Sequence, residues 1–318
     1  MTRASVLIPT HDKHTTLPLA VDSVLRQSVA DLEVLLIGDG VTEALRAEIE
    51  RLCATDSRVR FLDLPKGPHH GERYRHDAIL AAASDAILYL CDDDLFLPDH
   101  VADLLDLLGE HNFVQSFNGY CRPDGSVAFF GADLGNPTTV HLMLDERLGY
   151  NNASITGTGH SRAFYLEVGD RWETTPAGVH PDHHQWRKLW RHPSYRGATS
   201  HRMTALQLPT SSDGRDSWTP EQRHEELLGW YDLVRRPDAQ ERIDALVAAS
   251  ALRGLAELRD DGAWLRGLLL ERDDRIASLE AELATARRRL ARAQSRLDRK
   301  KSKLVRLRRA LGRPGSVE

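Results

Sequence analysis

The sequence of 318 residues contains few cysteines and no long apolar run, and these absences narrow the class of protein. Its three cysteines, Cys53, Cys91 and Cys121, are far apart and form no CxxC pair, which disfavours a disulfide framework or a zinc–thiolate site. No stretch approaches the roughly 18 apolar residues of a membrane-spanning helix. The first residues show no signal-peptide pattern. We therefore expect a globular cytoplasmic protein.

Three common enzyme motifs are also missing. The loop that follows the first strand-like run, residues 9–14, has no glycine-rich turn, which disfavours a nicotinamide or flavin enzyme. The sequence has no GxxxxGK[ST] loop, so a P-loop ATPase is disfavoured. It has no GxSxG elbow either, which disfavours an α/β-hydrolase.

Charge is divided unevenly along the chain. Residues 287–318 contain 13 lysines and arginines against two acidic residues, whereas residues 1–286 contain 29 basic and 45 acidic residues. The formal net charge of −5 therefore hides an acidic body and a basic tail. Such a tail indicates contact with an anionic partner.

The first hundred residues alternate strand and helix patterns, as a parallel α/β sheet does. Apolar runs predict four strands, at residues 6–8, 32–37, 59–62 and 86–90. The clearest helix lies between the first two, where apolar residues after the N-cap Thr16 follow the spacing of a helix packed on a sheet.

From residue 113 the patterns become shorter. Residues 113–117 and 127–130 flank a Pro-Asp-Gly turn and predict a β-hairpin. A segment rich in His, Trp and Arg at 180–192 predicts a helix. Residues 209–220 have the composition of a linker, and 221–258 are predicted to be helical.

The tail has the most regular periodicity in the sequence. Spacings of three and four alternate along one stripe: Ile276, Leu279, Leu283, Ala286, Leu290, Ala293, Leu297, Lys300, Leu304, Leu307 and Leu311. Five such heptads predict a coiled coil over residues 261–313 and self-association of the chain. A long single helix folded back on the body is the alternative.

A run of three carboxylates, Asp92, Asp93 and Asp94, follows the fourth predicted strand. These side chains repel one another unless a cation neutralises them. Mg²⁺ and Mn²⁺ prefer carboxylate oxygens and commonly bridge to substrate phosphates. Ligands of open parallel sheets bind beyond the carboxyl ends of the strands. The run therefore predicts a metal–phosphate site, with a helix cap and solvated acids as the alternative.

Four ordered segments resemble those of family 2 glycosyltransferases. They are residues 5–10, 23–28, 36–40 and 90–99, with a partial match near Asp182. The resemblance implies the GT-A fold, a Rossmann-like α/β domain with a mostly parallel central sheet flanked by helices, here followed by the long C-terminal helix or coiled coil. It also implies inversion at the anomeric carbon of a nucleotide-sugar donor.

The resemblance assigns donor-binding roles to five residues. Pro9, Thr10 and His11 would line the nucleobase. Asp39 would hydrogen-bond that base, commonly uracil. Arg75 stands where the family often has an Arg-Asn pair, so it would neighbour the donor.

Metal and catalytic roles are implied in the same way. Asp92 would face the ribose, and Asp93 would hold a divalent metal, Mn²⁺ or Mg²⁺, on the diphosphate, with Asp94 as a neighbouring alternative. His201 would add a ligand to this metal, as in some GT-A enzymes. Asp182 would be the general base.

The sequence departs from the family pattern at three positions. Gly38 and Cys91 each replace the first acid of a donor motif, and Pro181 replaces the glutamate that usually precedes the base. These changes leave one acid at each donor position and also fit a degenerate, inactive copy.

Two further groups have less specific patterns. The histidines of residues 180–184 could form a transition-metal site, although surface histidines on an aromatic helix are the favoured interpretation. Trp172, Trp186 and Trp190 could stack on a sugar or pack in the core.

Together these patterns predict a metal-dependent inverting glycosyltransferase. It would move a sugar from a UDP- or dTDP-linked donor to a glycan, lipid-linked or other hydroxyl acceptor, in the synthesis of a cell-surface or secreted glycan. A catalytically degenerate oligomeric scaffold is one alternative. A metal-dependent hydrolase or phosphotransferase is the other.

The expected domain organisation follows. Residues 1–210 would form the GT-A domain, with a nucleotide-binding half (1–110) and an acceptor half (111–210). Residues 211–260 would be a linker and helical extension, followed by the basic coiled coil. The tail would pair with its own copy and meet an anionic membrane surface, at the inner membrane face, or a polyanion. No motif indicates specific nucleic-acid recognition.

Overall fold

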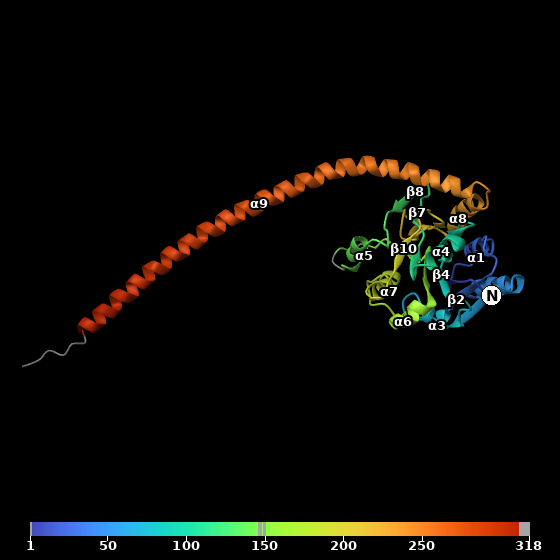
Figure 1. The fold of residues 1–318 in the computed structure, drawn as a ribbon, viewed down its shortest axis with the longest axis horizontal. Coiled ribbons are helices and arrows are strands. Elements are labelled where there is room, and N and C mark those ends of the chain that lie inside the picture. Colours follow the sequence, from blue (N-terminus) through green and yellow to red (C-terminus); the bar gives the residue numbers. More distant parts are fainter. Residues whose placement is uncertain (1, 146–147, 149–150, 312–318) are drawn as a thin grey trace, which may run out of the picture. The chain divides into compact units, whose positions relative to one another are not determined.

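The computed structural model describes the backbone of residues 2–145, 148 and 151–311 (Figure 1). Its centre is a seven-stranded sheet. In spatial order the strands are β10 (Gly197–Thr199), β6 (Phe113–Gln115), β9 (Thr158–Ser161), β4 (Ala86–Tyr89), β1 (Ala4–Thr10), β2 (Leu32–Asp39) and β3 (Val59–Leu64).

Strand direction confirms the mostly parallel sheet expected from the sequence. β1 pairs in parallel with β2 and β4, and β2 pairs in parallel with β3. Only β9 is antiparallel to its neighbours β4 and β6 among the described strands of this sheet. The carboxyl ends of β1, β2 and β4 therefore lie at one edge, together with the start of β9.

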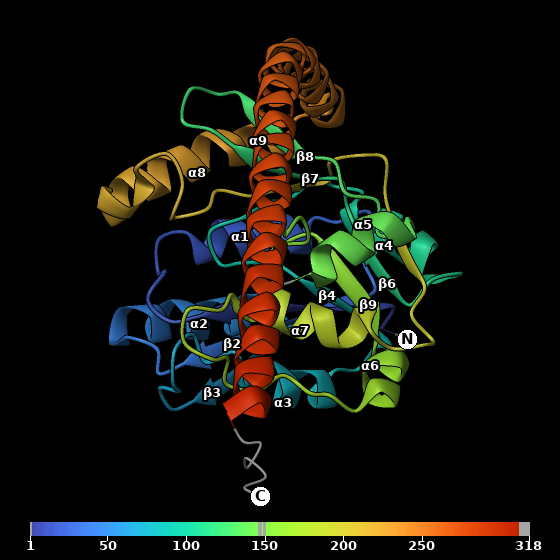
Figure 2. The ribbon, with the colours of Figure 1, turned by 90° about the vertical axis from the view of Figure 1, so that its left-hand side faces the viewer.

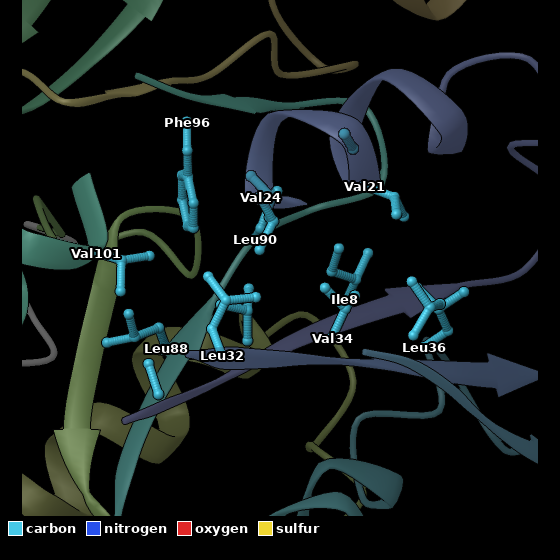
Figure 3. Packing of buried hydrophobic residues seen from close by; sticks show 14 of the residues in the cluster. Ile8, Val21, Val24, Leu32, Val34, Leu36, Leu88, Leu90, Phe96 and Val101 are labelled. Carbon is cyan, nitrogen blue, oxygen red and sulfur yellow. The ribbon is translucent and has the colours of Figure 1, made fainter. Parts of the chain in front are cut away.

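Helices cover both faces of the sheet, because successive side chains of a strand point to opposite faces. Three helices pack on one face: α1 (Leu17–Leu25), α2 (Glu43–Thr55) and α4 (His100–Leu108). Three others pack on the opposite face: α3 (Tyr74–Ala81), α6 (Arg162–Val168) and α7 (Pro181–Trp190). In β1, Ile8 joins the first core and Leu7 the second. Figure 3 shows Ile8 beside Val21 and Val24 of α1.

Other short elements form two pairs of strands and one helix. β5 (Leu95–Phe96) pairs with β11 (Ala205–Leu206), β7 (Asn118–Cys121) pairs with β8 (Val127–Phe130), and α5 is formed by Pro137–Leu144. The hairpin expected between residues 113–117 and 127–130 was wrong in its first strand. Residues 113–115 are β6 of the central sheet, and the turn joins Cys121 to Val127 instead.

The folded body, meaning the compact unit that contains the central sheet, extends past residue 210, the predicted end of the GT-A domain. The first of two compact units runs to Leu252. After a 3₁₀ helix, η2 (Arg215–Ser217), the helix α8 (Pro220–Val234) packs on α1. Tyr231 donates a hydrogen bond of 2.5 Å to Asp22, and His224 Nδ1 donates one of 2.8 Å to the Thr15 carbonyl. Residues 211–252 of the segment predicted as linker and extension are thus part of the first compact unit.

The last element is the helix α9 (Ala239–Leu311), which can be followed in Figures 1 and 2. The predicted C-terminal helix is thereby confirmed, whereas its pairing as a coiled coil stays a prediction. Residues 312 and 313 lie outside the described residues, as do the side chains of several stripe positions. Among the described helices, none has the length and hydropathy that crossing a membrane requires.

Candidate active site

The edge formed by β1, β2 and β4 brings together most of the residues predicted to bind the donor. Pro9 and Thr10 end β1, with His11 directly after them, and Asp39 ends β2. The Asp run (Asp92, Asp93 and Asp94) follows β4. Parallel pairing aligns Thr10 with Gly38, one residue before Asp39, so these strand ends are adjacent.

Asp39 is held by the loop of residues 65–72. Gly67 N donates a hydrogen bond of 2.6 Å to Asp39 Oδ1, and Lys66 forms an ion pair with the other oxygen. His11 Nδ1 donates to the Asp39 carbonyl at 2.7 Å. A side chain at Gly71, whose φ is +60°, would collide with the Asp39 carboxylate. Lys66 and Gly67 of this loop therefore hold both carboxylate oxygens of Asp39. A nucleobase would have to hydrogen-bond to oxygens that already have these partners.

Asp94 has a structural role in the described site. Thr156 Oγ1 donates to Asp94 Oδ2 at 2.6 Å, and Leu208 N donates to Asp94 Oδ1 at 2.7 Å. Burial, followed by the charge of Asp93, raises the pKa of Asp94 to about 7 despite these donors. Both carboxylate oxygens of Asp94 thus accept hydrogen bonds that connect the loop after β4 to the segments before β9 and after β11.

Asp93 faces two cations of the chain itself. Its Oδ2 lies 3.1 Å from Arg223 Nη2 on α8 and 3.6 Å from Lys13 Nζ in the loop after β1. Thr210 Oγ1 donates to the same oxygen at 3.3 Å. Next to it, burial and the charge of Asp93 raise the pKa of Asp92 to about 8.

Arg223 belongs to a buried network of charges. Its Nη1 donates to Glu226 at 2.9 Å, and its Nη2 donates to the Leu208 carbonyl at 2.6 Å. Arg215, fully buried, also donates to Glu226, and to the Cys121 carbonyl at 2.7 Å. Glu226 and two backbone carbonyls therefore compensate the charges of Arg215 and Arg223 behind Asp93.

Asp182 and Arg75 lie on the other side of the site. Asp182 is the second residue of α7, where His183 N donates to its Oδ1 at 2.7 Å. Burial raises the pKa of Asp182, and the charge of Arg75 counteracts this rise. Asp182 and Asp94 both raise the pKa of Tyr120 on β7, after the larger effect of burial. Asp182 on α7 and Asp94 of the Asp run therefore both act electrostatically on the phenol of Tyr120.

Arg75 is a buried cation with incomplete hydrogen bonding. It lies in the first turn of α3, with its guanidinium carbon 4.7 Å from the centre of the Trp172 ring. Its Nε and Nη1 have no hydrogen-bond partner among the described residues. Burial lowers the pKa of Arg75, and the neighbouring Cys91 and Asp182 oppose that change. Such unpartnered donors are costly and favour a polar or anionic ligand here.

The contacts of the described residues do not include one between His201 and the Asp run, so its role as a metal ligand stays a prediction. Arg202, its neighbour in sequence, approaches Asp103 of α4 at 3.8 Å. The chain then passes through β11 before Leu208 reaches Asp94.

The three candidate tryptophans and His183 are buried, whereas His180 is exposed and His184 is partly exposed. Trp172, Trp186 and Trp190 are buried on the second face of the sheet, as the packing interpretation predicts. His183 Nε2 donates to the Met143 carbonyl at 3.0 Å, and His184 approaches Glu173 at 3.3 Å. These contacts leave no transition-metal arrangement among the described residues.

The described residues do not fit the predicted metal site. Asp94 has both oxygens in hydrogen bonds, and Oδ2 of Asp93 faces Lys13 and Arg223. No three His, Cys, Asp or Glu side chains within residues 2–145, 148 and 151–311 converge as a ligand set. A divalent ion on Asp93 Oδ2 would have to displace two cations, one of them buried.

Several of these residues were not found from the sequence. Lys13 lies within the loop predicted to line the nucleobase, so its position could have indicated a role. Thr156, Thr210 and Arg223 have no such local signal, because they reach the Asp run only through the folding of distant segments.

Residues 5–162 match the family model described as glycosyl transferase family 2. With the strand order and the motifs above, this match shows that residues 5–162 form a family 2 glycosyltransferase domain. Arg223 and the whole of α8 lie outside the matched residues.

Curated relatives agree with this family. An uncharacterized glycosyltransferase of Rickettsia felis is 32% identical over 120 residues, which cover 37% of this chain and 19% of that protein. A chondroitin synthase of Pasteurella multocida is 32% identical over 127 residues, covering 39% of this chain and 13% of that protein. The chain therefore spans less than a fifth of the length of these relatives.

Solved structures show the fold. TarS 1-349 of S. aureus has a TM-score of 0.52 at 12% identity, over 80% of this chain and 72% of that chain. The same protein in complex with UDP-GlcNAc has a TM-score of 0.50 at 16% identity, over 80% and 73% of the two chains. The expected GT-A architecture is thereby confirmed.

Proposed function

We propose that the chain transfers a sugar from a nucleotide-sugar donor, UDP- or dTDP-linked, to a hydroxyl group of an acceptor, with inversion of the anomeric carbon. The observation that carries this proposal is the meeting of the donor-motif residues at the carboxyl ends of β1, β2 and β4. Asp182 on α7, the candidate base, acts on Tyr120 together with Asp94 and on Arg75 together with Cys91. Membership of family 2 supports the same reaction class.

Asp182 is the general base of the proposed reaction. It removes the proton of the acceptor hydroxyl as that oxygen forms its bond to the anomeric carbon. The bond from this carbon to the diphosphate breaks, and the nucleoside diphosphate leaves with the electron pair. Burial raises the pKa of Asp182, which makes its carboxylate a stronger base than an exposed one.

Named relatives support a role in the synthesis of a cell-surface or secreted glycan. One is the chondroitin synthase of Pasteurella multocida, and another is the succinoglycan biosynthesis protein ExoW of Rhizobium meliloti, 29% identical over 157 residues. The likeness to TarS bound to UDP-GlcNAc favours UDP as the first nucleotide to test. The predicted Mn²⁺ or Mg²⁺ requirement is not part of the proposal, because Asp93 already has its cations.

A donor panel tests the reaction. The purified full chain is mixed with UDP- and dTDP-sugars, with water as the default acceptor, and nucleoside diphosphate release is measured. We expect release from one donor class, and proton NMR of the first sugar product should show the inverted anomer. Retention of configuration, or release of inorganic phosphate in place of nucleoside diphosphate, would contradict the proposal.

The tail adds a second part to the proposal: residues 261–313 pair with a second copy, and the basic exterior contacts an anionic surface. Ile276, Leu279 and Leu283 are 47%, 46% and 51% exposed in the single chain, as expected of a seam without its partner. Sedimentation velocity should show that deletion of residues 270–318 reduces the number of chains per particle. An unchanged number would remove this part of the proposal.

A specific variant sharpens the test of the tail. Asparagine at both Leu279 and Leu283 should weaken association, because the seam would bury polar amides. Glu280→Gln, between them on the exposed helix, is the matched control and should leave association unchanged. Binding to vesicles containing anionic lipid, lost on deletion of residues 270–318, tests the contact with a membrane surface separately.

A further inference from the structure

The cations around Asp93 point to a donor site that works without a metal ion. Arg223 Nη2 and Lys13 Nζ lie 3.1 and 3.6 Å from the same carboxylate oxygen. Asp93 lies between the two cations, and Glu226 pairs with Arg223 from behind. Lys13 is therefore the cation with less compensation at the edge where the donor diphosphate is expected.

Arg223 is fixed in this position from behind. Glu226 and the Leu208 carbonyl accept hydrogen bonds from its guanidinium, and Arg215 holds Glu226 in turn. Only 5% of Arg223 is exposed. A guanidinium oriented by three acceptors is preorganised, which lowers the entropic cost of binding an anion.

A cavity of about 130 Å³ lies beside these cations. Lys13, Thr16, Thr210 and Arg223 contribute to its lining. Arg223 Nε and Thr16 Oγ1 have no hydrogen-bond partner among the described residues, although both residues are at least nine-tenths buried. Buried donors of this kind are destabilising until an acceptor oxygen arrives, and phosphate supplies such oxygens.

The acidic groups at this cavity do not cancel that preference. Asp12 and Asp216 also line it, but both are exposed, so water screens their charges. Arg223 and Arg215, by contrast, are buried and cannot be screened in this way. Glu226 and Asp93 balance the charges of these two arginines, so Lys13 and the unpartnered Arg223 Nε are the groups at the cavity that an anion can use.

We propose that Lys13 and Arg223 bind the diphosphate of the donor directly, in the place that a divalent cation would otherwise take. This inference rests on the proposed function, which supplies the nucleotide-sugar donor. Asp93 then positions the two cations and is not a metal ligand. Lys13, whose side chain is 32% exposed, is the part of the site that a ligand reaches first.

Calorimetric titration of the full chain with UDP tests the inference, first in EDTA and then in excess Mn²⁺. Inorganic pyrophosphate serves as a second probe. UDP should bind in EDTA, with an affinity within about twofold of that in Mn²⁺. Lys13→Gln should weaken binding about tenfold under both conditions, since one charge next to the phosphates is lost. Arg51→Gln, an exposed cation on α2, is the matched control and should bind like the unaltered chain.

Asp93→Asn distinguishes phosphate binding by chain cations from phosphate binding by a metal, because the two predict opposite effects on UDP affinity. With chain cations as ligands, removing the carboxylate frees them for phosphate, so UDP should bind equally well or more tightly. With a metal on Asp93, the same change abolishes binding. A requirement for Mn²⁺, together with lost binding in Asp93→Asn of unchanged melting temperature, would overturn the inference and leave the proposed function intact. Absence of UDP and dTDP binding under every condition would overturn both.

Discussion

The Asp run and the region around Asp182 and Arg75 share one edge of the sheet but are compensated very differently. Around the Asp run, the chain supplies partners of its own: Arg223 and Lys13 for Asp93, and two hydrogen-bond donors for Asp94. Across the site, Arg75 is buried with two nitrogens unpartnered among the described residues. The chain therefore compensates Asp93 and Asp94 more fully than it compensates Arg75, and both regions keep buried donors that a ligand can use.

The largest expected effect on activity comes from Asp182. Asp182→Asn keeps the shape of the side chain but cannot accept the proton of the acceptor hydroxyl. The kcat for donor turnover should fall by about 100- to 10,000-fold, the usual contribution of a general base. UDP affinity should stay unchanged. Asp170→Asn, an exposed carboxylate in the loop before α7, is the control and should retain full turnover.

The largest effect on stability is expected at Arg223. Arg223→Met removes the cation between Asp93 and Glu226, which leaves these buried carboxylates with only Lys13 and Arg215, respectively, as cationic partners. Urea denaturation should show a loss of about 3–5 kcal/mol in the free energy of unfolding, as for other broken buried pairs. Arg235→Met, near the end of the same helix and exposed, should change it by less than about 0.5 kcal/mol. A small loss for Arg223→Met would mean that the buried network is weak.

Arg75→Met should act in the opposite direction on stability. The substitution removes an incompletely paired buried charge while keeping apolar contact with Trp172, so stability should rise by about 1 kcal/mol. Donor turnover, measured as kcat/KM, should fall by at least about tenfold, because a ligand loses its cation. Arg73→Met, exposed two residues earlier, is the matched control. A loss of both stability and activity would contradict the contrast between the two regions.

The last prediction concerns the pH dependence of stability. The folded-state pKa values of Asp92 and Asp94 are raised to about 8 and about 7, so the folded chain binds more protons than the unfolded chain above pH 4. As far as these groups decide it, stability should therefore be highest at and below pH 4 and fall as the pH rises to 8. Asp94→Asn should flatten this slope, and exposed Asp31→Asn should leave it unchanged.

The sequence predicted the half of the site that depends on strand ends. Thr10, Asp39 and Asp93 follow apolar runs, and parallel strands bring their carboxyl ends to one edge, so local patterns were sufficient. Arg223 could not be found in this way. Its helix lies 130 residues after Asp93 and outside the residues that match the family model, and only the packing of α8 on α1 brings it close.

The hairpin and His201 show the same limit. An apolar run such as residues 113–115 fits a hairpin or a central strand equally well, and the tertiary pairing with β9 and β10 decides between them. His201 was assigned by resemblance to enzymes with a metal ligand late in the domain. Its neighbour Arg202 approaches Asp103 of α4, and the role of His201 stays a prediction.

A crystal structure of the full chain grown with UDP in the presence of EDTA is the most direct test of where the donor binds. The diphosphate should lie against Lys13 and Arg223, with the uracil beside Pro9–His11 and Asp182 on the opposite side of the phosphates. UDP bound away from the carboxyl ends of β1, β2 and β4, or with its phosphates remote from Asp182, would contradict the proposed glycosyl transfer at this edge.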